Sequence, residues 1–364
     1  MRKAFFNLHL WVALPVSILV AIFGLTGTIM AFEPEIDRVL NWKLSYVTPQ
    51  QHLLSLAEIG AAVSKAYPGE KIGAYQLATS PGLSYQVALR RGVVSVNPYT
   101  GEILGLREGG PGFLGFVHQF HLRLALRDRS NIGKTIMSWA GVAMLILLCT
   151  GLYLWWPLKR VSISRNGPPR RFWFDLHNAV GIVSLVFLLL LTITGVMIGF
   201  DRTIVPWFYK MTNSEPSKQP VIPPPPANGK PITPDQAIEI ARNALPGAMP
   251  FLVNIPGPKG FYFVRSRFPG DLTPGGRSRV AVDQYTGQVL SSESSRTAPA
   301  GTRMVNLNRA IHTGDIFGLP SKTILSLASL MLVIQVLSGI TMWLKRIRRP
   351  KRAATESANV SAAV

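Results

Sequence analysis

The stretch from Leu176 to Phe200 reads LHNAVGIVSLVFLLLLTITGVMIGF and contains no Lys, Arg, Asp or Glu. Such a run can cross the apolar core of a bilayer, which needs about 20 helical residues. Three further stretches of this kind occur, at residues 10–32, 135–158 and 323–344. The chain of 364 residues is 48% hydrophobic and 15% charged, and its mean hydropathy is +0.24. The sequence therefore predicts four membrane-spanning helices and argues against an ordinary soluble enzyme.

The positions of the basic residues predict the topology. The net charge of +20 could suggest nucleic-acid binding, but the basic residues flank the apolar stretches. Arg2 and Lys3 precede the first stretch, a basic loop follows the second, and a basic tail follows the fourth. By the positive-inside rule both termini are cytoplasmic, and residues 33–134 and 201–322 face the other side. We expect attraction to anionic membrane lipid and no nucleic-acid partner.

Two features narrow the class of protein further. The first apolar stretch has 23 residues, more than the about 7–15 of a signal-peptide core, so we expect a retained anchor. Cys149 is the single cysteine. A disulfide framework, a Cys-ligated cluster and a CxxCH haem attachment are therefore excluded within this chain.

The segments outside the membrane contain an internal repeat. VNPYTGEIL at residues 96–104 is echoed by VDQYTGQVL at residues 282–290. Both predict strand, tight turn and strand, because glycine supplies the positive φ that a short hairpin needs. We expect a helix upstream of each, at residues 54–67 and 233–245, and strands at residues 85–89 and 261–264. Each segment is therefore predicted to be a small α+β module, the second opened by a stiff polyproline linker at residues 219–231.

The membrane spans repeat as well. His9 stands 18 residues before Gly27, and His177 stands 18 residues before Gly195. In the other two spans, Thr150-Gly151 corresponds to Ser338-Gly339. These small pairs favour close helix packing, and a planar macrocycle also needs small residues where it lies against a backbone. The repeated unit is a span, an α+β module, a histidine-bearing segment and a second span.

The predicted fold class is a membrane all-α four-helix bundle carrying two extracytoplasmic α+β modules, with an internal duplication. The expected divisions are transmembrane helices at 1–32, 135–158, 172–200 and 323–344, modules at 33–110 and 201–302, interfacial histidine-bearing segments at 111–134 and 303–322, a cytoplasmic basic loop at 159–171 and a cytoplasmic basic tail at 345–364.

Six histidines carry the functional prediction. His9 and His177 occupy equivalent positions toward the cytoplasmic ends of their spans, whereas His312 and either His118 or His121 lie on the opposite side. A lone histidine near a helix end is usually interfacial, but two imidazoles facing each other in a bundle supply two axial nitrogens for one iron. Two such pairs predict two non-covalent b-type haems. Zinc, the competing metal, favours four ligands.

The pair His118 and His121 lies on one helical face, where the two could bind a metal together, share a haem or differ in role. His121 is the better counterpart of His312. Both are too far from the following Thr-Gly or Ser-Gly pair for one straight span, so we expect the chain to bend at Gly133 and near Gly314, Gly318 and Pro320. His52 has no repeat partner and is interpreted as a surface residue.

These features resemble the PepSY-associated transmembrane family of bacterial inner-membrane proteins, known as iron-regulated membrane proteins. The resemblance rests on the two Tyr-Thr-Gly hairpins with their helices, on TGLYLWWP at residues 150–157, and on the His-Thr-Gly that begins at His312. Similarity to FoxB-type ferric-siderophore reductases implies a haem-dependent enzyme that reduces ferric siderophores in the periplasm. It implies a multi-pass protein of the inner membrane with periplasmic modules, and the haem iron ligands His9, His177, His121 and His312. PepSY modules also occur as inhibitors in protease propeptides, so the module alone does not establish redox work.

The leading hypothesis is an oxidoreductase that passes electrons across the membrane through two haem b groups to a ferric siderophore and releases Fe(II), a softer ion that oxygen chelators hold less well. No GxGxxG follows a strand on the cytoplasmic side, so a quinol or a cytoplasmic-side protein is the expected electron donor. The acceptor would dock near His118, with candidate contacts at Trp207, Phe208, Tyr209 and Tyr262.

Two hypotheses from other classes compete with this one. A non-redox membrane regulator would bind a periplasmic protein or peptide through its modules, but it leaves the paired histidines unexplained. A transporter with a histidine proton relay is disfavoured, because no acidic partner other than Asp175 accompanies the spans.

Overall fold

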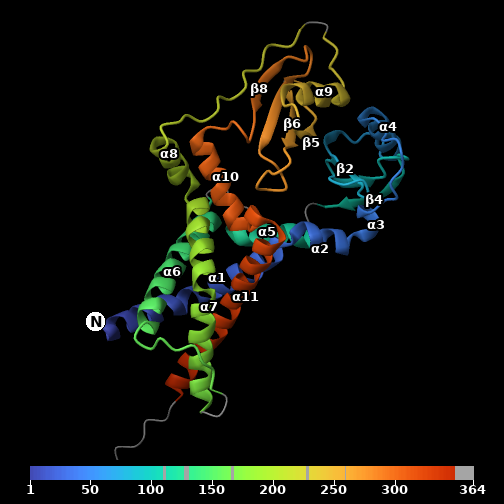
Figure 1. The fold of residues 1–364 in the computed structure, drawn as a ribbon. Coiled ribbons are helices and arrows are strands. Elements are labelled where there is room, and N and C mark those ends of the chain that lie inside the picture. Colours follow the sequence, from blue (N-terminus) through green and yellow to red (C-terminus); the bar gives the residue numbers. More distant parts are fainter. Residues whose placement is uncertain (110–111, 127–130, 165–167, 227–228, 259, 349–364) are drawn as a thin grey trace, which may run out of the picture.

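The computed structural model describes residues 1–364 except 110–111, 127–130, 165–167, 227–228, 259 and 349–364. Arg165 and the tail from residue 349 onward, which contribute to the topology prediction, lie outside the described residues. Figure 1 shows two regions, a group of long helices and a β-sheet that lies at one end of that group.

Four long helices form the first region: α1 (Arg2–Ala31), α6 (Ile132–Trp155), α7 (Pro169–Gly199) and α11 (Leu319–Ile347). All four are long and apolar enough to cross a membrane, which confirms the four predicted spans by length and composition. Apolar side chains also cover the outside of the bundle; Ile18 is 71% exposed and Val186 is 63% exposed. Because a soluble protein rarely exposes so continuous an apolar surface, this region is built for lipid.

Small residues and hydroxyls hold the bundle together. Helices α1 and α7 each pack against both α6 and α11. At the α1–α11 contact, a Cβ added to Gly24 would lie 2.8 Å from the Ser329 carbonyl oxygen, so only glycine permits this approach. The Thr28 hydroxyl donates to the Ser326 carbonyl at 3.2 Å, and the Ser326 hydroxyl donates back to the Thr28 carbonyl at 3.3 Å. Close backbones and interhelical hydrogen bonds replace the hydrophobic effect, which is lost in lipid.

Short helices occupy the region between bundle and sheet, namely α2 (Glu33–Leu40), α3 (Trp42–Ser45), α5 (Gly112–Arg123), α8 (Asp201–Met211), α10 (Ala300–Thr313) and the 3₁₀ turn η1 (Asp315–Phe317). The predicted bends occur here. Helix α10 ends at Gly314 with a left-handed φ of 77°, and Gly318, with a φ of 64°, precedes α11. At the start of α6, a Cβ on Gly133 would lie 2.0 Å from the Arg123 carbonyl oxygen, so glycine lets α6 abut the end of α5.

The second region is one antiparallel sheet of eight strands in the order β4-β3-β2-β1-β5-β6-β7-β8. Helices α4 (Leu56–Ala66) and α9 (Pro234–Ala244) pack on it, and their apolar side chains share one core with the strands. The strands are β1 (Ile72–Gln76), β2 (Tyr85–Leu89), β3 (Gly92–Val96), β4 (Ile103–Glu108), β5 (Met249–Asn254), β6 (Phe261–Arg267), β7 (Ser278–Asp283) and β8 (Val289–Glu293).

Local sequence signals explain these elements. Ser55 and Thr233 each form a capping box with the residue three positions later, so α4 and α9 begin at Leu56 and Pro234, within two residues of the predicted starts. The β3–β4 and β7–β8 hairpins turn at the two Tyr-Thr-Gly motifs. Gly101 and Gly287 adopt φ values of 72° and 71° there, which confirms the predicted role of glycine.

The two halves of the sheet are not separate modules, and in this respect the structure differs from the sequence prediction. Strand β1 pairs with β5 through Ala74↔Asn254, Tyr75↔Val253 and Gln76↔Leu252. The carboxylate of Asp235 on α9 also accepts hydrogen bonds from the first backbone amides of α4, Leu56 N at 2.7 Å and Ala57 N at 3.0 Å. The halves join because β1 and β5 would otherwise each expose a row of unpaired backbone groups.

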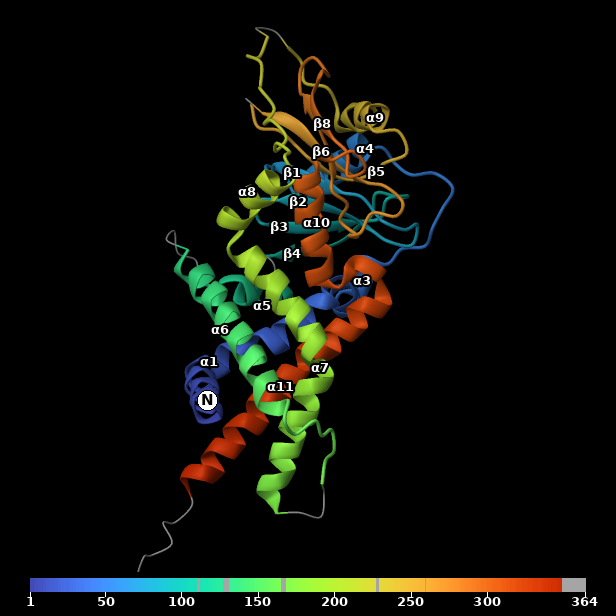
Figure 2. The ribbon, with the colours of Figure 1, turned by 60° about the vertical axis from the view of Figure 1, so that its left-hand side comes forward.

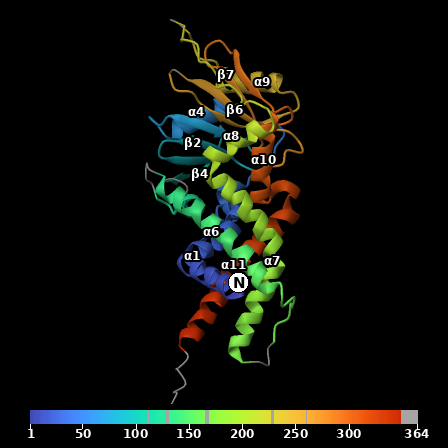
Figure 3. The same cartoon turned by 90° about the vertical axis from the view of Figure 1, so that its left-hand side faces the viewer.

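The sheet lies at one end of the bundle, and the basic residues at the end of α11 lie at the other. In Figures 2 and 3 the sheet is at the top, whereas the α6–α7 connection and the end of α11 are at the bottom. Helices α5 and α10 lie between them. Side chains from these two helices can therefore reach both the sheet and the bundle.

Candidate functional site

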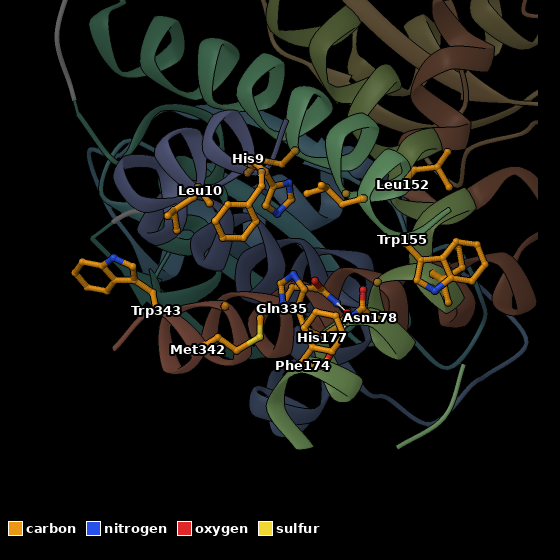
Figure 4. Close-up of a pocket in the computed structure, with 18 of the residues that line it drawn as sticks. His9, Leu10, Leu152, Trp155, Phe174, His177, Asn178, Gln335, Met342 and Trp343 are labelled. Atoms are coloured by element: carbon orange, nitrogen blue, oxygen red, sulfur yellow. Dashed lines mark hydrogen bonds between the residues drawn. The ribbon is translucent and has the colours of Figure 1, made fainter. Parts of the chain in front are cut away.

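Two histidines from different spans meet in the half of the bundle farther from the sheet. His9 comes from α1 and His177 from α7, and their ring centres lie 6.4 Å apart with an angle of 88° between the rings. Figure 4 shows the two rings facing each other across a cavity. The equivalence seen in the repeat is therefore a pairing in space, which we call the inner pair.

A second pair lies nearer the sheet. His121 of α5 and His312 of α10 have ring centres 6.4 Å apart, the same separation as the inner pair, with an angle of 52° between the rings. His118 is not part of this outer pair, because its Nδ1 lies 3.1 Å from the Glu33 carboxylate at the start of α2. His118 therefore contacts Glu33 rather than His312, and its predicted part in binding a cofactor stays a prediction.

A hydroxyl from a neighbouring helix holds each of the four imidazoles at Nδ1. Every one of these hydroxyls belongs to a Thr-Gly or Ser-Gly pair, and we call the four pairs the hydroxyl–glycine pairs. The Nδ1-to-oxygen distances are 2.9 Å for His9 to Thr150, 2.9 Å for His177 to Ser338, 2.7 Å for His121 to Thr26 and 3.1 Å for His312 to Thr194.

These hydroxyls also determine which ring nitrogen carries the proton. Each donates its own hydrogen to the carbonyl four residues earlier in its helix; Thr150 donates to Ile146 and Ser338 donates to Ile334, both at 2.7 Å. A hydroxyl has one hydrogen, so its oxygen can only accept from the imidazole, and the neutral ring must be protonated at Nδ1. The lone pair then lies on Nε2, which is the nitrogen left free for a metal.

The glycine of each pair leaves room for the ring. A Cβ added to Gly151 would lie 3.4 Å from Cε1 of His9, and one added to Gly339 would lie 3.5 Å from Cε1 of His177. The approach is closest at Gly195, where the added Cβ would lie 2.9 Å from Cε1 of His312. Each hydroxyl of the four pairs therefore orients one imidazole, and at Gly195 the absence of a side chain also makes room for the ring.

The inner pair lines a cavity of about 1240 Å³ between the four spans. Ligand pockets usually have about 300–1,000 Å³, so a macrocyclic cofactor can enter this one. Most of the lining is apolar, and both Gly151 and Gly339 contribute to it. The remaining part is strongly basic, with Arg2, Lys3, Arg160, Arg170, Arg171 and Arg346. The cavity therefore suits a largely apolar ligand with anionic groups at one edge.

Both histidines of the outer pair are uncharged at neutral pH. Burial lowers the pKa of His121 to about 3, and His312 and His118 contribute in the same direction. Burial also lowers the pKa of His312 to about 4, with the Leu191 carbonyl opposing and the charge of Arg309 adding to the shift. Neutral imidazole is the form that binds a metal, so the outer pair is ready to do so without losing a proton.

The separation between the ring centres of each pair matches the separation that two axial imidazoles on one metal would have. Two metal–imidazole bonds of about 2.0 Å, together with the distance from each nitrogen to its ring centre, place the ring centres about 6 Å apart. The observed 6.4 Å agrees with this value. A structural zinc site uses four protein ligands, and within the described ranges neither pair is joined by a third His, Cys, Asp or Glu. Two facing imidazoles are instead the ligand set of a six-coordinate haem iron.

Other residues considered from the sequence are not members of either pair, although Asp175 also lines the inner cavity. His52 is exposed, as predicted. Asp175 accepts the backbone amide of Ser164 at 3.1 Å and thus holds the loop before its own helix. Of the aromatic residues predicted to contact an acceptor, Phe208 and Tyr262 are only 4% exposed, so that prediction is wrong for both: each packs into the protein interior.

The hydroxyls are the functional residues that sequence reasoning missed. The sequence analysis attributed the Thr-Gly and Ser-Gly pairs to helix packing or to contact with a macrocycle, not to the histidines. A signal was present in their number, since four such pairs accompany four candidate ligands. The sequence did not predict which hydroxyl bonds to which histidine, because the partners lie on different helices. His9 bonds to Thr150 of α6 rather than to Thr26 of its own helix.

Comparison with known proteins agrees with this architecture. A protein-family model described as the PepSY-associated TM region matches residues 6–346, which is nearly the whole chain. A search of curated proteins finds no match.

The glycine at residue 195 offers a test of the geometry. We expect Gly195→Ala to lower the free energy of unfolding by about 1–3 kcal/mol, because the new methyl group would press on a ring that is already held in place. Gly339→Ala is the matched control: its contact is an ordinary one, and alanine favours the helix by about 1 kcal/mol. Unfolding of the full chain in mixed micelles, titrated with SDS, measures both. Equal destabilisation of the two variants would contradict the close approach at His312.

Proposed function

This chain belongs to the PepSY-associated transmembrane family, and from that premise we propose that it is a di-haem b oxidoreductase of the bacterial inner membrane that reduces a periplasmic ferric siderophore and releases Fe(II). One observation carries the proposal. Two imidazole pairs, each with ring centres 6.4 Å apart, lie at two depths of one helix bundle. A protein that used its histidines only for packing would not need the same separation twice.

The residues present fit two haems. His9 and His177 would ligate the inner haem, and His121 and His312 the outer one, each through Nε2. Haem b, when bound, supplies reversible one-electron transfer. The basic residues in the wall of the inner cavity suit the propionate groups, because carboxylates bind guanidinium strongly. The hydroxyl–glycine pairs hold the rings in the required tautomer before any cofactor arrives, which lowers the cost of binding it.

The two pairs are well placed for transfer across the membrane. His9 belongs to the inner pair, and Thr26 holds His121 of the outer pair. Both His9 and Thr26 are on α1. At 1.5 Å per residue these positions are about 26 Å apart along the helix, close to the about 30 Å thickness of the bilayer core. An apolar layer that includes Val20, Met144 and Leu188 fills the bundle between them. This layer keeps water and protons from the path.

The orientation follows from charge. We infer that the end with the basic loop is cytoplasmic and that the sheet lies in the periplasm, because positively charged loops are retained inside. On this orientation the inner pair faces the electron donor, a quinol or a cytoplasmic-side protein, and the outer pair faces the acceptor. We also infer an internal duplication, since each half supplies one histidine to each pair and four strands to the sheet. FoxB-type ferric-siderophore reductases are the group that we propose as functionally similar.

Reduction is a sensible route to iron release. One electron from the donor converts Fe(III) to Fe(II), and the chelator itself is unchanged. Oxygen donors bind Fe(II) less tightly than Fe(III), because Fe(II) carries the smaller charge. The chelator therefore releases the reduced ion. The protein needs no general acid or base for this step, which agrees with a site built from ligands and their supports alone.

A non-redox regulator is the second candidate, and one observation favours it. The sheet ends in the edge strands β4 and β8, and a cavity of about 560 Å³ lies between β8 and the linker near Pro223. An edge strand can bind an extended peptide by pairing with it. This function would not require the two histidine pairs, so a cofactor analysis separates the candidates.

The first test is the haem content. We expect the purified full chain, expressed with haem supplied, to show b-type α-bands in a reduced-minus-oxidised spectrum and two haems per chain by pyridine haemochrome. His177→Ala should retain only the outer haem and His312→Ala only the inner one. His118→Ala and His52→Ala should retain both. A chain without haem under these conditions, or variants with unchanged haem content, would refute the assignment.

The second test concerns a supporting hydroxyl. Ser338→Ala removes the acceptor for the Nδ1 proton of His177, and we expect haem affinity at the inner pair to fall about 10–100-fold. Thr341→Ala is the control, because this exposed hydroxyl of the same helix bonds only to the Leu337 carbonyl in the described structure. Haem titration of the apoprotein, followed by absorbance, gives both affinities. Equal affinities would remove the role of Ser338 in orienting the ligand.

The third test concerns the reaction. In proteoliposomes loaded with a reductant and carrying a quinone, we expect an external ferric chelate to be reduced, with Fe(II) trapped by ferrozine. Loss of either haem should lower the rate by at least about 100-fold, because both centres are in series. Chelate reduction that persists in His177→Ala at the original rate would exclude transfer across the membrane through the inner pair.

A further inference from the structure

The short helices α2 and α3 expose their apolar side chains. We call these two helices, residues 33–45, the α2–α3 segment. In α2, Ile36, Val39 and Leu40 have the i, i+3, i+4 spacing that places side chains on one face of a helix. Val39 is 72% exposed, Leu40 is 62% exposed, and Trp42 of α3 is 60% exposed. A surface helix of a soluble protein turns such a face toward the core, so this segment is arranged in the opposite way.

The charged side chains of α2, by contrast, are directed toward the protein. Each of its three acidic residues contacts a basic residue of another element. The distances are 3.1 Å between Glu33 and His118 of α5, 3.7 Å between Glu35 and Lys322 of α11, and 2.8 Å between Asp37 and Arg107 of β4. The polar sides of α2 therefore bind the bundle and the sheet, whereas the described chain leaves its apolar face largely uncovered.

The inner side of α3 is fixed to the sheet region. A Cβ added to Gly105 of β4 would lie 2.7 Å from Cδ2 of Leu44, so the leucine packs directly against this strand. The Ser84 hydroxyl donates to the Leu44 carbonyl at 2.6 Å, and the Ser84 amide donates to the Ser45 carbonyl at 2.9 Å. The exposed apolar face thus belongs to a segment that is held in place on its other side.

The position of the segment indicates what covers this face. Helix α2 begins at Glu33, two residues after the span α1 ends at Ala31, so the face continues the lipid-facing surface of that span. In Figure 1 the α2–α3 segment extends from the end of α1 past the side of the bundle, on the side of the sheet that faces the bundle. A surface at this level meets the boundary between headgroups and acyl chains.

The residue types at the end of the segment suit that boundary. Trp42 and Tyr46 are both exposed, and aromatic rings with a polar atom are enriched where membrane meets water. The ammonium group of Lys43 lies 5.7 Å from the centre of the Trp42 ring. Its long side chain can carry the charge to a lipid phosphate while the indole stays in the apolar layer.

We propose that the α2–α3 segment inserts its apolar face into the membrane leaflet on the sheet side and anchors the sheet on the membrane surface. The partner is membrane lipid, with acyl chains against Val39 and Leu40 and headgroups near Trp42 and Lys43. The ion pairs of α2 transmit this restraint to the sheet and to the start of α11. The inference concerns residues that were predicted to belong to the first module, and it is independent of any cofactor.

The test measures the surroundings of single labels on the full chain in phosphatidylcholine nanodiscs. Cysteines at Val39→Cys and Leu40→Cys, in a Cys149→Ser background, carry the polarity-sensitive dye NBD. Val186→Cys, on the exposed surface of α7, is the control for lipid, and Val221→Cys, which is 83% exposed in the linker, is the control for water. Nitroxide lipids and aqueous iodide serve as quenchers.

We expect the labels at residues 39 and 40 to emit at shorter wavelength than the label at residue 221. Nitroxide lipids should quench them at least about twofold more, and iodide at least about twofold less, than the label at residue 221. Iodide quenching equal to that at residue 221 would overturn the proposal. Labels that neither quencher reaches would place the face against a second copy of the chain and would overturn it as well.

A second measurement avoids the bulk of the dye. The unlabelled cysteine variants react with a charged methanethiosulfonate reagent, and the rate is followed by mass spectrometry. Val39 and Val221 have similar exposed fractions in the chain alone, 72% and 83%. We expect the thiol at residue 39 to react at least about tenfold more slowly, because an apolar environment suppresses the reactive thiolate. Equal rates for the two thiols would contradict insertion into lipid.

Discussion

The hydrogen bond between a helix hydroxyl and an imidazole Nδ1 is the interaction on which the bundle centre depends. A threonine or serine whose proton is already given to its own helix can only accept, so the neutral histidine opposite must keep its proton on Nδ1. One contact thereby settles the ring orientation and the tautomer. The glycine that follows the Thr194 hydroxyl leaves the space that the His312 ring needs, since a Cβ at Gly195 would lie 2.9 Å from Cε1 of that ring.

These hydrogen bonds also connect the elements. No described histidine of a pair is held by its own helix: α1 is tied to α6 through His9, α7 to α11 through His177, α5 to α1 through His121, and α10 to α7 through His312. The two short helices near the sheet are thus fixed to the spans by the residues that form the outer pair. Any cofactor between the rings would further cross-link the same helices, since binding stabilises the state that binds.

Charge is distributed unevenly along the bundle. Basic residues line the inner cavity at the end away from the sheet, and an apolar layer that includes Val20, Met144 and Leu188 lies between the two histidine pairs. A cavity that is mostly apolar and basic at one end suits a largely apolar ligand with anionic groups at that edge.

The sequence alone determined the four spans, the two hairpins, the capped helices and the breaks at Gly314 and Gly318, because apolar length, capping residues and positive-φ glycines act locally. It also pointed to His9, His177 and His312 through their matched spacing. Only the tertiary structure decided that His121 rather than His118 faces His312, that Thr150 rather than Thr26 holds His9, and that β1 and β5 merge the modules into one sheet. These facts depend on which helices and edges become neighbours. A repeat predicts equivalent residues, but the contacts between the repeats are set by packing of the whole chain.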